Sequence, residues 1–240
     1  MEQKLLQKEA EIYQQSFSNV QISQKKSYQK NLIDKLRREK TLSDEEFLEL
    51  IITKDSWILE YLYKSAREVC ECYYGRKIFI RGLIEFTNYC RNNCYYCGIR
   101  RDNQKAERYR LSEEEICSCA DEGYELGFRT FVLQGGEDCY FTKERLGQII
   151  RRMKTTHSDC AVTISFGEWD VETYRYWYQC GADRYLLRHE SADAGHYQML
   201  HPEQMNLQHR MECLKQLKEI GYQVGAGFMV GSPGQRVEMM

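Results

Sequence analysis

The chain has 240 residues, of which 42% are hydrophobic and 29% are charged, and its formal net charge is −2. This is the composition of a globular protein with enough apolar mass for a large core. The charge argues against a nucleic-acid partner, because nucleic-acid-binding proteins usually carry a clustered basic excess. Apolar runs stay shorter than the roughly 18 residues that a membrane span needs, and the N-terminal segment MEQKLLQKEAEIYQQ lacks a signal-peptide core. We therefore expect a cytoplasmic protein without a membrane partner.

The cysteine content indicates reduced thiols rather than disulfides. Eleven cysteines are an odd number, and the chain is too long to depend on a disulfide framework. Eight of them show no spacing typical of metal ligands and are interpreted as small apolar residues of the interior. These eight are Cys70, Cys72, Cys117, Cys119, Cys139, Cys160, Cys180 and Cys213.

The first third of the chain is predicted to be helical, since neither glycine nor proline occurs before Gly75. Ser43 and Glu46 have the spacing of a capping box, so we expect a new helix to begin there. Residues 1–27 are rich in Gln, Lys and Ser, and are expected to form a solvated helix or a loosely ordered extension. The predicted domains are an N-terminal helical extension over residues 1–75 and a second domain over residues 76–240.

From Lys77 onward, short apolar runs alternate with amphipathic stretches, which predicts a parallel sheet with crossover helices. The predicted strands lie near residues 78–80, 83–86, 130–133, 161–164, 184–187 and 224–230, and the predicted helices near 112–126, 142–156, 171–180 and 204–220. The fold class is α/β, a partial TIM-type (βα) barrel of about five to six units. Five units are too few to close an eight-stranded barrel, so the sheet is expected to be open or to belong to a truncated or split polypeptide.

Three cysteines directly after a predicted strand form the motif C-x3-C-x2-C, namely Cys90, Cys94 and Cys97. Soft thiolates from one loop can each bind one iron of a 4Fe-4S cluster, which leaves the fourth iron without a protein ligand. Three alternatives stay open at this point: a zinc site, which usually has four ligands when structural, a fully ligated ferredoxin cluster, which needs a fourth cysteine, and a chance spacing.

The motif, with the aromatic Tyr96 before its third cysteine, resembles the signature of the radical S-adenosylmethionine (SAM) superfamily. The resemblance implies that the open iron binds SAM and that the reduced cluster cleaves it to a 5′-deoxyadenosyl radical, with Tyr96 among the cofactor-binding residues. Gly135-Gly136-Glu137 resembles the motif of that superfamily that contacts the SAM amino group. Glycines let a backbone approach a ligand closely, and a carboxylate accepts hydrogen bonds from an ammonium.

Longer segments are similar to the FeFe-hydrogenase maturase HydE family and to its relative, methylornithine synthase. Residues 84–94 and 96–103 carry this resemblance, and residues 165–168, 181–190 and 225–231 favour HydE. It implies that Glu168 binds the SAM ribose and that Arg188 pairs with the SAM carboxylate, roles that suit these side chains. His189, Glu190 and Met229, each also compatible with packing, are the candidate substrate positions.

The HydE resemblance implies a role in maturation of the FeFe-hydrogenase H-cluster, under anaerobic conditions. The implied substrate is a small iron–cysteine complex. The implied partners are a low-potential electron donor, such as a ferredoxin or a flavodoxin-like protein, and other hydrogenase maturation proteins. Two alternatives stay open: a methylornithine synthase-like radical mutase, and a non-catalytic iron–sulfur scaffold.

Overall fold

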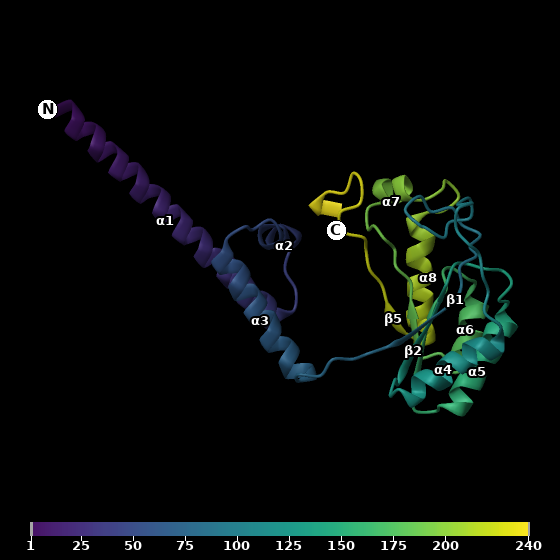
Figure 1. The fold of residues 1–240 in the computed structure, drawn as a ribbon. Coiled ribbons are helices and arrows are strands. Elements are labelled where there is room, and N and C mark those ends of the chain that lie inside the picture. Colours follow the sequence, from purple (N-terminus) through teal and green to yellow (C-terminus); the bar gives the residue numbers. More distant parts are fainter. Residues whose placement is uncertain (1, 240) are drawn as a thin grey trace. The chain divides into compact units, whose positions relative to one another are not determined.

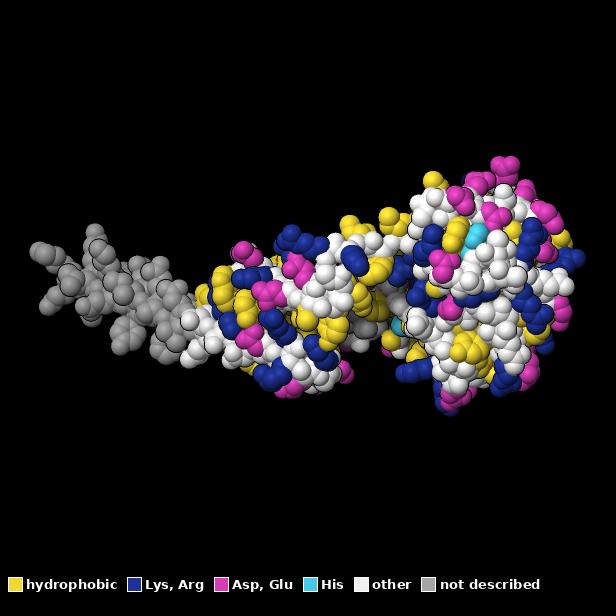
Figure 2. Space-filling view, turned by 90° about the horizontal axis from the view of Figure 1, so that it is seen from below, with side chains coloured by type: hydrophobic (Ala, Val, Ile, Leu, Met, Phe, Trp, Pro, Cys, Tyr) yellow, Lys and Arg dark blue, Asp and Glu magenta, His cyan; other side chains and the backbone are white. Residues whose placement is uncertain are grey.

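A computed structural model describes residues 2–239 of the chain, with the side chains of residues 21–239. The chain divides into two compact units, Met1–Ile78 and Phe79–Met240. The first is all helical, and the second is an α/β unit (Figure 1). Basic and acidic side chains are interspersed on the face shown in Figure 2. Among the described residues, no helix is long and apolar enough to cross a membrane.

Three helices form the first unit: α1 (Glu2–Glu39), α2 (Asp44–Ile51) and α3 (Ser56–Tyr74). The predicted capping box is present, because the Glu46 amide donates to the Ser43 hydroxyl at 3.3 Å and the Ser43 amide donates to the Glu46 carboxylate at 2.9 Å. The buried core consists of Leu32, Ile33, Leu42, Leu50 and Ile58. In the expected extension 1–27, the backbone from Glu2 is helical, while the side chains before residue 21 lie outside the described part.

The second unit contains a five-stranded parallel sheet with the order β1-β2-β3-β4-β5. Its strands are β1 (Gly82–Thr87), β2 (Thr130–Gly135), β3 (Ala161–Ser165), β4 (Arg184–Leu186) and β5 (Gln223–Gly225). Neighbours in space are also neighbours along the chain, as in a (βα) barrel, whereas a doubly wound sheet reverses its strand order. The observed order therefore confirms the predicted barrel-type arrangement.

Five helices and a short 3-10 turn connect or follow these strands. They are α4 (Glu113–Glu125), α5 (Lys143–Thr156), α6 (Val171–Gln179), α7 (Ala194–Leu200), α8 (Leu207–Ile220) and η1 (Val237–Met239). The capping box of Ser112 and Glu115 begins α4, as predicted. The seven-residue helix α7 was not predicted, since a segment this short shows little periodicity.

The two faces of the sheet differ in character because side chains alternate along each strand. One row of adjacent residues is buried against the helices: Ile84, Leu133, Ile164 and Tyr185. The next row lines a pocket on the opposite face: Glu85, Gln134 and Ser165. The polar row therefore faces the pocket, on the side of the sheet opposite the buried row.

Three expectations were wrong in detail. Residues 78–80 form no strand and are exposed (Ile78 88%, Ile80 67%), because the sheet begins only at Gly82. The fifth strand ends at Gly225 rather than near residue 230, and the chain beyond it pairs irregularly through a single bridge between Glu190 and Phe228. Four of the eight cysteines expected in the interior are exposed, namely Cys70, Cys72, Cys119 and Cys139.

Candidate functional site

The segment after β1, here called the cysteine loop (residues 88–103), brings its three cysteines to one pocket. Cys90, Cys94 and Cys97 all line the pocket at the carboxyl ends of the strands. Two backbone bonds hold the loop in place: the Arg91 amide donates to the Glu137 carbonyl, and the Tyr95 amide donates to the Leu200 carbonyl, both at 2.9 Å. The turn after β2 and the end of α7 therefore anchor the loop on two sides.

Gly136 lets this loop approach the turn after β2. A Cβ atom at this position would lie 2.4 Å from the Tyr89 carbonyl oxygen and 2.7 Å from Cys90 Cβ. Distances below 3.0 Å are essentially absent from real structures. The sequence predicts that the two glycines let a ligand approach. In the structure, Gly136 also lets Cys90 pack against the turn after β2.

The three thiols fit a cluster better than a single metal ion. In a tetrahedral zinc site with Zn–S bonds of about 2.3 Å, sulfur ligands lie about 3.8 Å apart. Among the described residues, the only trio that brings its ligand atoms within 4.8 Å of one another is a different one, so the cysteines of the loop are spread more widely. A wider spread suits a cubane, in which each cysteine binds a different iron. Burial, reinforced by Cys90 and Cys97, raises the pKa of Cys94 to about 11, so this thiol keeps its proton at neutral pH until a metal displaces it.

Glu137 lines the pocket with its side chain 6% exposed. Its Oε2 accepts a hydrogen bond from Arg91 Nε and its Oε1 accepts one from the Glu168 amide, each at 2.9 Å. An ionised carboxylate has about four lone-pair positions, so it can accept further donors from a ligand. The predicted contact with the SAM amino group is therefore compatible with this geometry and stays a prediction.

Three further predicted residues also line the pocket: Tyr96, Arg188 and Glu190. Arg188 Nε lies 3.3 Å from Glu190 Oε1, but the arginine side chain is 56% exposed. Glu190 has a φ of +63°, an uncommon conformation for a residue other than glycine. Tyr96 shares a hydrogen bond of 3.1 Å between its hydroxyl and Nε2 of the buried His201.

Glu168 departs from its predicted place, since it is not among the described residues that line the pocket. Its Oε1 lies 2.7 Å from Nε of Arg210, and the two side chains are only 12% and 9% exposed. Burial raises the pKa of Glu168, while Arg210 opposes that shift. Arg210 does line the pocket, so Glu168 lies next to a lining residue, and its predicted contact with the SAM ribose stays a prediction.

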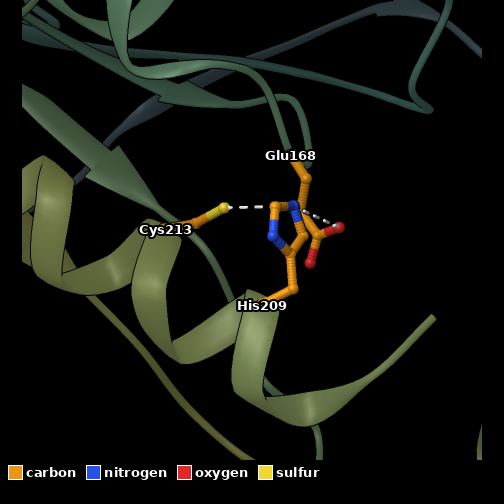
Figure 3. Close-up of side chains that lie close together, drawn as sticks. All are labelled: Glu168, His209 and Cys213. Atoms are coloured by element: carbon orange, nitrogen blue, oxygen red, sulfur yellow. Dashed lines mark hydrogen bonds and ion pairs between the residues drawn. The ribbon is translucent and has the colours of Figure 1, made fainter.

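Glu168 also lies beside His209 and Cys213, as Figure 3 shows. His209 Nε2 lies 3.8 Å from Glu168 Oε2 and 3.7 Å from Cys213 Sγ. These ligand types at this spacing could hold a cation, but the guanidinium of Arg210 already neutralises Glu168. The positive charge of Arg210 would oppose a cation bound beside it, and the His209 side chain is 61% exposed, so we interpret the group as an ion-pair cluster.

Two candidate substrate residues lie elsewhere than predicted. His189 does not line the pocket; its ring stacks against Phe228 with the centroids 6.5 Å apart. Met229 lies beyond the end of β5, so it does not occupy an inward position of that strand. The expectation for Met229 assumed a fifth strand that continues to residue 230, whereas β5 ends at Gly225.

Comparison with known proteins decides the family. Residues 84–240, which include the cysteine loop and all five turns that follow the strands, match the sequence profile of the radical SAM superfamily. This chain belongs to the radical SAM superfamily. Membership implies a 4Fe-4S cluster and SAM as cofactors, in agreement with the spread of the three thiols.

Within the superfamily, the chain is similar to maturases and to a synthase. It is 42% identical over 209 residues to the [FeFe] hydrogenase maturase subunit HydE of Thermotoga maritima, which covers 87% of this chain and 59% of that protein. It is 31% identical over 192 residues to 3-methylornithine synthase of Methanosarcina acetivorans, covering 79% and 54%. The chain thus spans between half and three fifths of the length of these curated relatives.

Solved structures of radical SAM proteins show the same fold. The crystal structure of methylornithine synthase (PylB) superimposes with a TM-score of 0.79 at 29% identity, covering 87% of this chain and 61% of that one. That of HydG, a maturase of the [FeFe]-hydrogenase, gives 0.77 at 26% identity, covering 86% and 47%. Both confirm the α/β barrel-type architecture.

One pocket residue of this radical SAM chain, Arg210, was missed from the sequence. A signal was present, since buried residues recur on α8 at the helical spacing 210, 213, 214 and 217, and the first of them is an arginine. A charged residue in an apolar stripe indicates a buried partner, and here that partner is Glu168.

Proposed function

We propose that the chain is the catalytic part of a HydE-type radical SAM enzyme that acts in maturation of the FeFe-hydrogenase H-cluster. The pocket at the carboxyl ends of the strands, where Cys90, Cys94 and Cys97 meet, carries the proposal. The 42% identity to HydE, against 31% to methylornithine synthase, supports the maturase over the synthase.

A 4Fe-4S cluster with bound SAM would supply a 5′-deoxyadenosyl radical, and Cys90, Cys94 and Cys97 would hold that cluster. Glu137 would accept hydrogen bonds from the SAM ammonium, because its carboxylate faces the pocket and is fixed by Arg91. Fixing the acceptor in advance lowers the ordering cost of binding.

Arg210 and Glu190 are better placed than the predicted Arg188 and Glu168 to bind the carboxylate and the ribose of SAM. Arg210 is a buried cation that lines the pocket, and charges interact more strongly where water is excluded. It is therefore a better partner for the SAM carboxylate than Arg188, whose side chain is 56% exposed. Glu190 lines the pocket where Glu168 does not, and so is the better acceptor for ribose hydroxyls.

The similarity to HydE and HydG supports a role beside other hydrogenase maturation proteins. We propose a small iron–cysteine complex as substrate, a ferredoxin or flavodoxin-like electron donor, and contacts with other hydrogenase maturation proteins in the cytoplasm. Methylornithine synthesis is the second candidate function, because the synthase structure superimposes with a TM-score of 0.79. It would be recognised by an isomerised product formed from lysine and SAM.

The test is anaerobic reconstitution with iron and sulfide, followed by electron paramagnetic resonance of the reduced protein with and without SAM. We expect a 4Fe-4S signal that changes when SAM is added, together with formation of 5′-deoxyadenosine. Cys94→Ala should abolish both, and Cys119→Ala, at an exposed cysteine of α4, should preserve both. A cluster that ignores SAM would refute the catalytic proposal in favour of an iron–sulfur scaffold.

A further inference from the structure

The cysteine loop is closed at its base by the chain that follows it. The amide of Asn88 donates to the Tyr109 carbonyl at 3.4 Å, and the Tyr109 amide donates to Asn88 Oδ1 at 2.8 Å. Thr87 and Arg110 form an antiparallel bridge one residue further out. The segment around Arg108 therefore lies against the first residue of the loop, although about 20 residues of chain separate them.

From this position, the guanidinium of Arg108 reaches both ends of the loop. Its Nη1 donates to the carbonyl of Asn88, two residues before Cys90, and at 2.9 Å to that of Ile99, two residues after Cys97. Its Nη2 donates to the carbonyls of Arg100 at 2.7 Å and Asn103 at 3.2 Å. One side chain thus ties the segment entering the three cysteines to the segment leaving them.

The arrangement uses a property that only arginine has. The two terminal nitrogens of a guanidinium carry four N–H groups in a planar fork, and here four carbonyl oxygens receive them. A lysine carries three donors on a single atom and cannot span the same acceptors. In the described part of the chain, Arg108 has no carboxylate partner within ion-pair distance, so its hydrogen-bonding capacity is directed to the loop.

We propose that Arg108 is a positioning residue that closes the cysteine loop and so fixes the spacing of the three cluster ligands. The inference rests on the proposed function, because it concerns the loop that would hold the cluster. Arg108 does not touch the pocket. It acts through the backbone on either side of Cys90 and Cys97, by preventing the two ends of the loop from separating when a cluster binds or is lost.

Arg101 provides a matched control, since it belongs to the same loop and its guanidinium hydrogen-bonds to the neighbouring Asp102 rather than to the ends of the loop. Arg108→Lys keeps the charge and removes the fork, and Arg108→Gln removes both. Together with Arg101→Lys, these variants separate the geometry of the fork from the charge of the side chain.

The experiment compares the wild-type protein with the three variants after anaerobic reconstitution. It measures iron and sulfide content, the rate of iron loss to a chelator, the SAM concentration that changes the resonance signal, and the thermal midpoint of the cluster-free protein. For both Arg108 variants we expect iron loss at least about tenfold faster than in wild type, as for loss of one or two charge-assisted hydrogen bonds. The cluster-free thermal midpoint should stay close to wild type, and Arg101→Lys should behave as wild type throughout.

Three other outcomes would overturn the inference. If Arg108→Lys releases iron at the wild-type rate, the fork does not position the ligands, and the inference is wrong while the proposed function stands. A cluster-free Arg108→Lys that is unfolded would make Arg108 a residue of the fold and would equally overturn the inference. A wild-type protein that takes up no cluster would overturn the proposed function and the inference with it.

Discussion

Replacing Gly136 with alanine should damage cluster binding far more than it damages the fold. The new Cβ would lie 2.4 Å from the Tyr89 carbonyl oxygen, and contacts below 3.0 Å are essentially not found, so the two backbones must separate by about 0.6 Å. The obstructing atom belongs to the backbone and cannot rotate away. Overpacking of this kind costs about 1–3 kcal/mol, which lowers the thermal midpoint of a chain of this length by about 2–4 °C per kcal/mol.

The displaced neighbour is Cys90, whose Cβ would lie 2.7 Å from the new methyl group. Metal–ligand distances normally stay within about 0.2 Å of their usual values, so a Cys90 displaced by about 0.6 Å should load iron less stably. Iron content and the reduced-state resonance signal measure this directly. Gly98→Ala is the control, because a Cβ at this position, also in the cysteine loop, meets no atom within 4 Å. Wild-type iron content in Gly136→Ala would refute the argument that Gly136 seats the loop.

Two further perturbations test the surroundings of the pocket. Glu168→Leu leaves Arg210 buried without its partner and should lower the urea-unfolding free energy by about 3–5 kcal/mol. Glu172→Leu, which removes an exposed ion pair, should cost less than about 1 kcal/mol, and equal losses would contradict the reasoning. Burial lowers the pKa of His201 from 6.5 to about 4, so the unfolded state binds its proton first and stability is lost as the pH falls from about 6.5 to about 4. His201→Gln should flatten urea-unfolding midpoints across that range; an unchanged slope would show that another group causes it.

The strands, the long helices and the cysteine motif were predictable because each depends on local chemistry. Capping boxes at Ser43 and Ser112 marked helix starts correctly, since capping involves residues three positions apart. The strand predicted at residues 78–80 does not form, because an apolar run becomes a strand only where a neighbouring strand can pair with it. The predicted strand near residues 224–230 was too long for a related reason: glycines weaken a regular strand, and β5 ends at Gly225, before Met229.

The residues that hold the cysteine loop were harder to find, because their partners are distant in sequence. His201 reaches Tyr96 across 105 positions, and α7, which ends just before it, supplies the Leu200 carbonyl to the loop. Arg108 is only 20 positions from Asn88, but its acceptors are backbone carbonyls, which every residue has. The spacing of the cysteines predicts the cluster ligands. No comparable sequence pattern predicts the residues that position those ligands.

The two carboxylates after β2 and β3 show how the family pattern and the structure combine. Glu137 and Glu168 are joined, because the amide of Glu168 donates to Glu137 Oε1 at 2.9 Å. Gly167 makes this possible: its φ is +72°, and a Cβ there would lie 2.0 Å from Glu137 Cγ. The turn after β3 can therefore lie directly against Glu137, and the next residue places the Glu168 carboxylate beside Arg210. Gly167 thus lets the two turns pack together, with Glu137 and Arg210 lining the pocket and Glu168 paired to the arginine.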